Sequence, residues 1–208
     1  MPKVILIYSL RRYGDIMTTV YFVRHAEPNY QNHNDILREL SEKGLNDSLL
    51  VTQFLADKNV DVVLSSPYKR AIDTISDFAK IKNLSIGIVD DFRERKISEK
   101  WIDNFDAFSR AQWDNFEFKL YDGESLNEVQ KRNIAALNDV LVLHKGKTIV
   151  IGSHGTALST IINYYDKEFG YSEFENIRTL MPWIVEFTFD GNACIKIEQY
   201  DVFKKKRV

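Results

Sequence analysis

Three short apolar runs constrain the fold of this chain more than any other feature. They lie at residues 18–23, 61–64 and 148–151, and none of them alternates between apolar and polar positions. Short runs of this kind are typical of strands covered on both faces, as in parallel sheets. Helical patterns separate them. The sequence therefore predicts an α/β fold, a three-layer α/β/α sandwich with a mostly parallel central sheet.

The helical patterns and one hairpin complete this prediction. We expect one helix from Ser41 to about Lys58 and a further strand at residues 85–89. The inner face of that helix should carry an apolar stripe, formed by Leu45, Leu49, Leu50, Phe54 and Leu55. Ser125 and Glu128 form a capping-box pattern that predicts another helix start. Two β-prone runs at residues 183–189 and 193–200 flank a turn sequence, which predicts a hairpin at the sheet edge.

The length of 208 residues fits one domain, expected at residues 18–203. Residues 1–16 are expected to be an N-terminal extension, because the first strand pattern begins just after Met17. Residues 92–122 are rich in aromatic and charged residues without a clear period, which predicts an inserted lid. Most of its aromatic side chains should pack as core, with Trp101 and Phe105 facing the pocket.

Composition argues against several classes of partner. The formal net charge of −2 gives no reason to expect nucleic acid, and no run is long enough to span a membrane. The single cysteine, Cys194, excludes an internal disulfide and fits a cytoplasmic location. The spacings between the four histidines match no common ligand pattern, so we expect no metal. His33 and His144 are assigned to surface or structural roles. The oligomeric state stays open.

Unusual residues follow three of the predicted strands. Arg24 and His25 follow the first, Ser66 and Arg70 the second, and His154 the last. Because the carboxyl ends of parallel strands meet at one edge of a sheet, these side chains should lie together. Grouping four potential cations is unfavourable unless an anion completes the site. A phosphoryl group fits, since guanidinium groups match its oxygens.

The stretches "VRHAE", "SSPYKRAIDT" and "GSHGTA" occur in this order between about Thr18 and Thr160. Together they resemble the histidine phosphatase superfamily, the phosphoglycerate mutase-like family. The resemblance implies that His25 is the nucleophile that takes the phosphoryl group. It also implies that Arg24, Arg70, His154 and the backbone N–H groups around Gly155 hold the phosphoryl oxygens. We expect His154 to act in its protonated form.

The resemblance further implies a carboxylic acid after the third strand, in a Leu-x-Glu context. Phe92-Arg93-Glu94 fits that context, so Glu94 is expected to protonate the leaving oxygen, with Asp91 and Glu99 as rivals. Two departures from the family pattern are visible. Ala26 stands where glycine is usual, which requires a negative φ there. The family's phosphate-binding asparagine could correspond to Asn29, Gln31 or Asn32.

These observations predict a metal-independent, cofactor-free phosphatase that acts on a small phosphorylated metabolite through a phosphohistidine on His25. A phosphoglycerate mutase is the main alternative. The family's mutases usually carry a longer, more basic insert, whereas residues 92–122 include several acidic side chains. A binding module without activity is the third possibility, and it is disfavoured because every matched position holds a competent residue.

Overall fold

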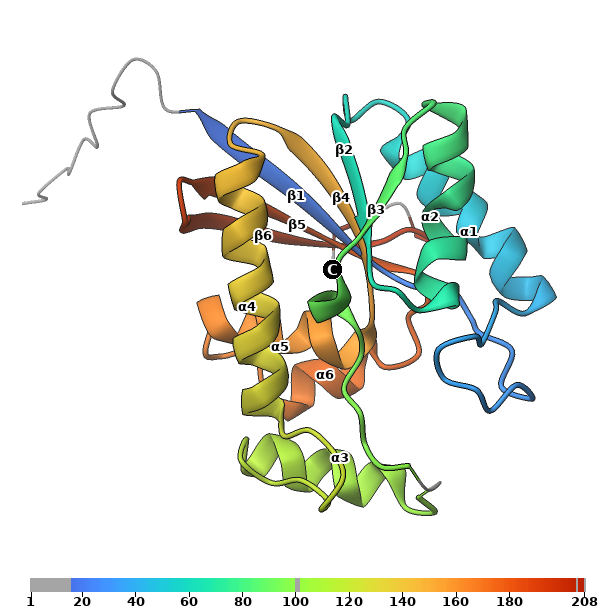
Figure 1. Cartoon of the computed structure of the whole chain (residues 1–208), viewed down its shortest axis with the longest axis vertical. Coiled ribbons are helices and arrows are strands. Elements are labelled where there is room, and N and C mark those ends of the chain that lie inside the picture. The colour runs from blue at the N-terminus through green and yellow to red at the C-terminus, as the bar shows by residue number, and fades with distance from the viewer. Residues whose placement is uncertain (1–15, 100–101, 205, 208) are drawn as a thin grey trace, which may run out of the picture.

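The computed structural model describes residues 16–99, 102–204 and 206–207. Its centre is a seven-stranded sheet with the order β3-β2-β4-β1-β5-β6-β7 (Figure 1). The strands are β1 (Met17–Arg24), β2 (Val62–Ser65), β3 (Ile86–Ile88), β4 (Thr148–Ser153), β5 (Trp183–Asp190), β6 (Ala193–Asp201) and β7 (Lys206–Arg207).

The sheet has a parallel half and an antiparallel half. β3, β2, β4 and β1 run parallel, and β5, β6 and β7 continue the sheet with each strand antiparallel to the one before it. The predicted α/β class is confirmed, and so is the hairpin, which joins β5 to β6 through Gly191 at a φ of 57°. The sheet is thus mixed, with its parallel half carrying the strand ends of interest.

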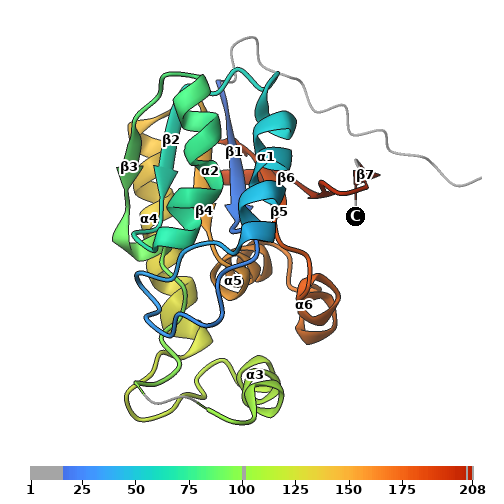
Figure 2. The same cartoon turned by 90° about the vertical axis from the view of Figure 1, so that its right-hand side faces the viewer.

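Helices cover both faces of the sheet (Figures 1 and 2). α1 (Glu42–Leu55) and α2 (Lys69–Ile81) pack on one face, and α4 (Leu126–Leu143) and α5 (Gly155–Tyr165) pack on the other. β1 contributes to both cores: Val20 and Phe22 enter one, and Tyr21 and Val23 enter the other. This two-sided burial explains why the strand is apolar without alternation. The capping box at Ser125 and Glu128 is also confirmed.

The predicted stripe on α1 is partly wrong. Leu45 and Leu49 are 53% and 45% exposed, and the helix buries Gly44, Ser48, Val51 and Leu55 instead. The cause is the loop that follows β1. A Cβ on Gly44 would lie 2.0 Å from the backbone oxygen of Glu27, so only glycine allows this approach. The small residues therefore face that loop, and Leu45, about 100° further around the helix, faces solvent.

The segment at residues 92–122 contains α3 (Phe105–Asp114), which lies beyond the end of the sheet where β1, β2 and β4 finish (Figures 1 and 2). α3 packs on α6 (Tyr171–Ile177). Its Trp113 is buried against Phe169 and Phe174, so this part of the aromatic segment is core. Phe105 is half-buried between two arginines, and Trp101 lies outside the described residues.

Nearly all of the expected N-terminal extension, residues 1–15, also lies outside the described residues. Within the described part of the chain, no helix is both long enough and apolar enough to cross a membrane.

Candidate active site

His25 stands directly after β1, and its ring is fixed by a backbone carbonyl. The backbone N–H of His25 donates to the backbone oxygen of Ser153 at 3.1 Å, which continues the pairing of β1 with β4. The ring Nδ1 lies 2.7 Å from the oxygen of Ala26, and the side chain is buried. Because a carbonyl can only accept, the proton must sit on Nδ1. Nε2 therefore carries the free lone pair that a nucleophile requires.

Ala26 replaces the family's glycine without strain. The non-glycine residues with positive φ in the described parts of the chain are Asn59 and Asn83, so the φ of Ala26 is negative. Its side chain is fully buried, and its N–H donates to Thr74 Oγ1 at 2.9 Å. The requirement set by the sequence is met, and the carbonyl of Ala26 is free to hold His25.

His154 comes from the end of β4 and meets both other strand ends. Its ring centroid is 5.3 Å from that of His25, and its Nε2 lies 2.7 Å from Ser66 Oγ, after β2. Ser66 Oγ accepts from the N–H of Tyr68, which leaves the hydroxyl hydrogen for Nε2. This favours the tautomer with a proton on Nδ1. Nδ1 is buried and has no hydrogen-bond partner among the described residues.

Burial keeps both imidazoles neutral. It lowers the pKa of His25 well below the ordinary 6.5, and the nearby cations Arg70 and Arg24 lower it further. Burial lowers the pKa of His154 in the same way, helped by Arg70. These shifts apply before an anion binds, so the expectation that His154 acts in its protonated form stays a prediction for the site with a phosphoryl group. A buried imidazolium beside guanidinium groups is disfavoured twice, by desolvation and by repulsion.

Arg70 reaches the site from the first turn of α2. Its side chain is buried, and its guanidinium lies 4.9 Å from the ring of Tyr68. Nη1 donates to the backbone oxygen of Asp35 and lies 3.2 Å from the carboxylate of the same residue. Burial lowers the pKa of Arg70, and Asp35 partly offsets this effect. No local sequence pattern indicates that a carboxylate stands beside this arginine.

Arg24 is held by the chain segment that follows α6. Nη1 donates to the oxygens of Ile177 and Leu180 at 2.8 and 3.2 Å, and Nη2 donates to that of Arg178 at 3.0 Å. Nε is buried without a partner among the described residues. Burial lowers the pKa of Arg24 to about 10. Gly155, the first residue of α5, packs against this guanidinium: a Cβ there would lie 3.0 Å from Nε.

Glu94 lies at the N-terminus of α5, the helix that begins directly after His154. Its carboxylate accepts from the N–H groups of Thr156 and Ala157, at 3.0 and 3.1 Å, and from that of Arg95 at 2.8 Å. A carboxylate is favoured at this end of a helix. The rival acids lie elsewhere. Asp91 pairs with Arg93, and Glu99 pairs with Lys96 on the surface.

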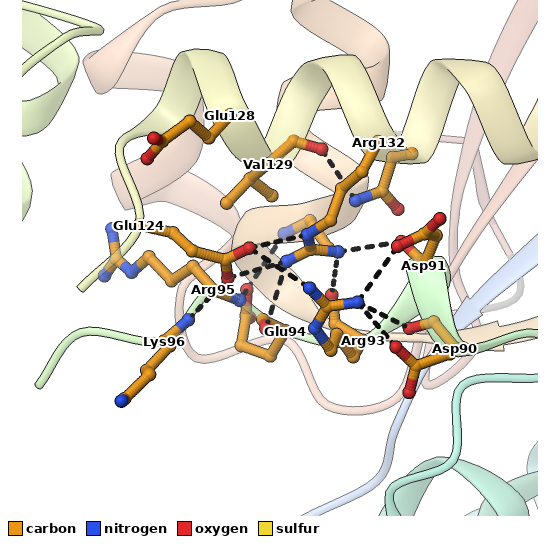
Figure 3. A network of polar contacts seen from close by, with 12 residues as sticks. Asp90, Asp91, Arg93, Glu94, Arg95, Lys96, Glu124, Glu128, Val129 and Arg132 are labelled. Carbon is orange, nitrogen blue, oxygen red and sulfur yellow. Dashed lines mark hydrogen bonds and ion pairs between the residues drawn. The ribbon is translucent and has the colours of Figure 1, made fainter. Parts of the chain in front are cut away.

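The candidate asparagines build the loop after His25. The amides of Asn29 and Asn32 each donate to Glu39 at 2.7 Å, and the N–H of Gln31 donates to Asn29 Oδ1. Two further polar residues surround the backbone of Glu94 (Figure 3). Glu124 lies in the stretch Gly123-Glu124-Ser125, which is similar to the family's Gly-Glu-Ser, whereas no sequence pattern indicated Arg132. No three or more His, Cys, Asp or Glu residues in the described part of the chain are grouped so that they could hold a metal.

Comparison with known proteins agrees with this geometry. The family profile of the histidine phosphatase superfamily (branch 1) matches residues 20–200. Phosphoserine phosphatase 1 of Hydrogenobacter thermophilus is 28% identical over 155 residues, 66% of this chain and 71% of that protein. A probable phosphoglycerate mutase of Yersinia pestis is 27% identical over 161 residues, 71% of this chain and 74% of that protein.

The fold has solved counterparts as well. A phosphoserine phosphatase mutant from Entamoeba histolytica, solved in complex with phosphoserine, matches with a TM-score of 0.69 and 20% identity. The match covers 86% of this chain and 96% of that one. Profile, motifs and fold therefore agree over almost the same residues. The chain belongs to the histidine phosphatase superfamily and is a histidine-type phosphatase.

Proposed function

We propose that this enzyme hydrolyses a small phosphate monoester through a phosphohistidine on His25. The observation that carries the proposal is the Nδ1 contact of His25 with Ala26, which leaves Nε2 as an unprotonated nucleophile. The lowered pKa of His25 keeps the ring neutral near pH 7. Beside it, Arg24 Nε and His154 Nδ1 are buried donors without partners among the described residues. Oxygens of a phosphoryl group would satisfy both.

In the first step, Nε2 of His25 attacks phosphorus while the bond from phosphorus to the ester oxygen breaks. Glu94 gives a proton to that oxygen, which leaves as an alcohol. Arg24, Arg70 and His154, with the N–H of Gly155, hold the equatorial oxygens, whose charge they stabilise.

In the second step, Glu94 takes a proton from a water molecule while the oxygen of that water attacks phosphorus. The phosphorus–nitrogen bond breaks, phosphate leaves and His25 returns to its neutral form. The guanidinium groups of Arg24 and Arg70 supply the positive charge of the site, so the proposed mechanism needs no metal. The segment at residues 92–122 acts as the lid and sets specificity.

A phosphoglycerate mutase reaction is the alternative, because a relative of that name also matches, with 27% identity. A mutase must retain a bisphosphorylated intermediate, and acidic side chains in the lid would weaken that retention. Five acidic residues in the lid favour hydrolysis: Glu99, Asp103, Asp106, Asp114 and Glu117.

The test is a panel of phosphate monoesters that includes phosphoserine and the phosphoglycerates, with and without EDTA. We expect release of inorganic phosphate from at least one member, unchanged by EDTA. Interconversion of 2- and 3-phosphoglycerate without phosphate release would instead support the mutase. Failure to hydrolyse any member, including p-nitrophenyl phosphate, would support a binding module.

A further inference from the structure

One guanidinium holds the chain around Glu94 (Figure 3). Arg132, on α4, has a side chain that is only 11% exposed. Nη1 donates to the backbone oxygens of Asp91 and Arg93 at 2.7 and 2.9 Å, and Nη2 donates to that of Glu94 at 3.2 Å. A short 3-10 helix (Asp90–Phe92) ends here, and Arg93 and Glu94 follow in no helix or strand, so the bonds from Arg132 help to fix the path of these two residues.

Glu124 completes the arrangement as the counterion. It accepts from Nε and Nη2 of Arg132 at 2.8 and 3.0 Å, which makes the pair bidentate. Its Oε2 also accepts from the N–H of Lys96 at 2.9 Å, two residues beyond Glu94. Burial raises the pKa of Glu124, but the bonds from Arg132 and Lys96 outweigh it and hold the pKa below its usual value. The carboxylate thus stays charged.

Both the backbone carbonyl and the side-chain carboxylate of Glu94 are held by hydrogen bonds. Arg132 binds its carbonyl from α4, and the first N–H groups of α5 bind its carboxylate. The two helices pack against each other, and Gln130 on α4 donates to the oxygen of Thr160 on α5 at 2.8 Å. The distance from the carboxylate to the two imidazoles therefore depends on where α4 holds the loop.

From this geometry we infer that Arg132, charge-balanced by Glu124, is the positioning residue that places Glu94 for proton transfer. The inference rests on the proposed role of Glu94. A planar fork with five donors can bind a carboxylate and three carbonyls at once, which lysine cannot do. Stability alone gives no reason for the arrangement, since buried ion pairs are often replaceable by apolar residues.

The experiment compares two substrates whose leaving groups differ. An alkyl phosphate that the enzyme accepts in the panel above releases an alkoxide, which needs a proton, whereas p-nitrophenyl phosphate releases a stable phenolate. Glu94→Gln should lower kcat for the alkyl ester by roughly 10²-fold or more, and far less for the aryl ester. Arg132→Lys should show the same selectivity, with a loss of about tenfold or more confined to the alkyl ester.

The double variant Arg132→Lys/Glu94→Gln separates positioning from general damage. If Arg132 acts through Glu94, Arg132→Lys should add almost nothing to the loss of activity on the alkyl ester that Glu94→Gln already causes. Lys131→Met, an exposed change one residue earlier on α4, is the matched control and should leave both rates unaltered. Thermal melting of each variant identifies any that fail to fold. Glu124→Gln, which removes the counterion of Arg132, provides a second variant that disturbs the same ion pair.

The outcomes distinguish the inference from the function on which it rests. The positioning role is overturned if Glu94→Gln loses activity selectively on the alkyl ester while Arg132→Lys loses activity equally on both esters or not at all. The role of Glu94 as proton donor is not affected by that result. Equal losses on both esters in Glu94→Gln overturn the proton donor, and the positioning role falls with it. Selective, non-additive losses in both variants support the inference.

Discussion

Two halves of the site satisfy their polar groups in opposite ways. The strand-end half, made of Arg24, His25, Arg70 and His154, contains two buried nitrogen atoms without partners in the described chain, Arg24 Nε and His154 Nδ1. The acid half is made of Glu94, Glu124 and Arg132, and other groups of the protein satisfy its hydrogen bonds. Each carboxylate accepts three or more hydrogen bonds, and the guanidinium donates more than three.

The difference shows how the two halves divide their work. Buried donors without partners cost free energy, which a bound anion would recover. The strand-end half should therefore respond to phosphate in its stability and pH dependence. A carboxylate that transfers a proton must be held in a fixed position, and the hydrogen bonds of the acid half hold Glu94 in this way.

The largest effect is expected from removing the nucleophile. His25→Ala should lower kcat by about 10⁴-fold or more, because the strand-end half then lacks the atom that forms the covalent bond. His144→Ala, at the C-terminal end of α4, is the control and should retain wild-type activity. Steady-state assays on the best substrate of the panel measure both. An active His25→Ala enzyme would mean that the strand-end half only binds.

The two arginines of the strand-end half should differ from each other. Either alanine substitution should lower kcat/KM by roughly 10²- to 10³-fold, through lost stabilisation of the phosphoryl oxygens. Arg24→Ala should also lower the free energy of unfolding by about 1–3 kcal/mol, because three carbonyls after α6 lose their donor. Denaturant unfolding measures this. Equal destabilisation by Arg70→Ala would remove the distinction.

A smaller effect is expected in the pH dependence of stability. Burial lowers the pKa of His25 and His154, so below about pH 6.5 the unfolded chain binds protons that the folded chain excludes. The free energy of unfolding should then fall as the pH falls, by up to about 1.4 kcal/mol per pH unit for each histidine. Inorganic phosphate should reduce this loss, since an anion favours the imidazolium forms.

Denaturant unfolding between about pH 7.5 and pH 5, with and without phosphate, tests this. His154→Asn should show a shallower slope than the wild type. An identical slope, or a slope indifferent to phosphate, would contradict the idea that this half is built for an anion.

The smallest effect concerns Asp35, whose carboxylate stands beside both Arg70 and Arg38. Asp35→Asn should tighten the binding of inorganic phosphate by about two- to fivefold, because a half-exposed carboxylate competes weakly with the anion. Product inhibition measures the change, and Asp57→Asn, exposed and outside the site, is the control. Weaker phosphate binding would show that Asp35 orients Arg70 rather than competing for it.

Most of the strand-end half could be predicted from sequence because Arg24 ends a strand and His25 and His154 directly follow one. The rule that strand ends meet at one edge of the sheet then brings His25, Ser66 and His154 together. Local pattern could not show that Arg24 donates to carbonyls more than 150 residues away. Nor could it give the rotation of α1, which depends on the contact of Gly44 with Glu27.

The acid half was only partly predictable. The family pattern indicated Glu94, and the structure places it at α5 rather than its rivals Asp91 and Glu99. Arg132 carries no local signal, since an arginine on a helix usually faces solvent. Its role depends on which backbone carbonyls the tertiary fold turns toward α4, and spacing along the sequence does not encode that.

Trapping of the intermediate tests the central claim most directly. The enzyme is mixed with a ³²P-labelled substrate from the panel, quenched in base within the first turnover and digested for mass spectrometry. Our account predicts stoichiometric label on Nε2 of His25, stable to base and labile to acid, and no label in His25→Ala. Label on another residue, or phosphate release with no labelled enzyme at any time, would contradict it.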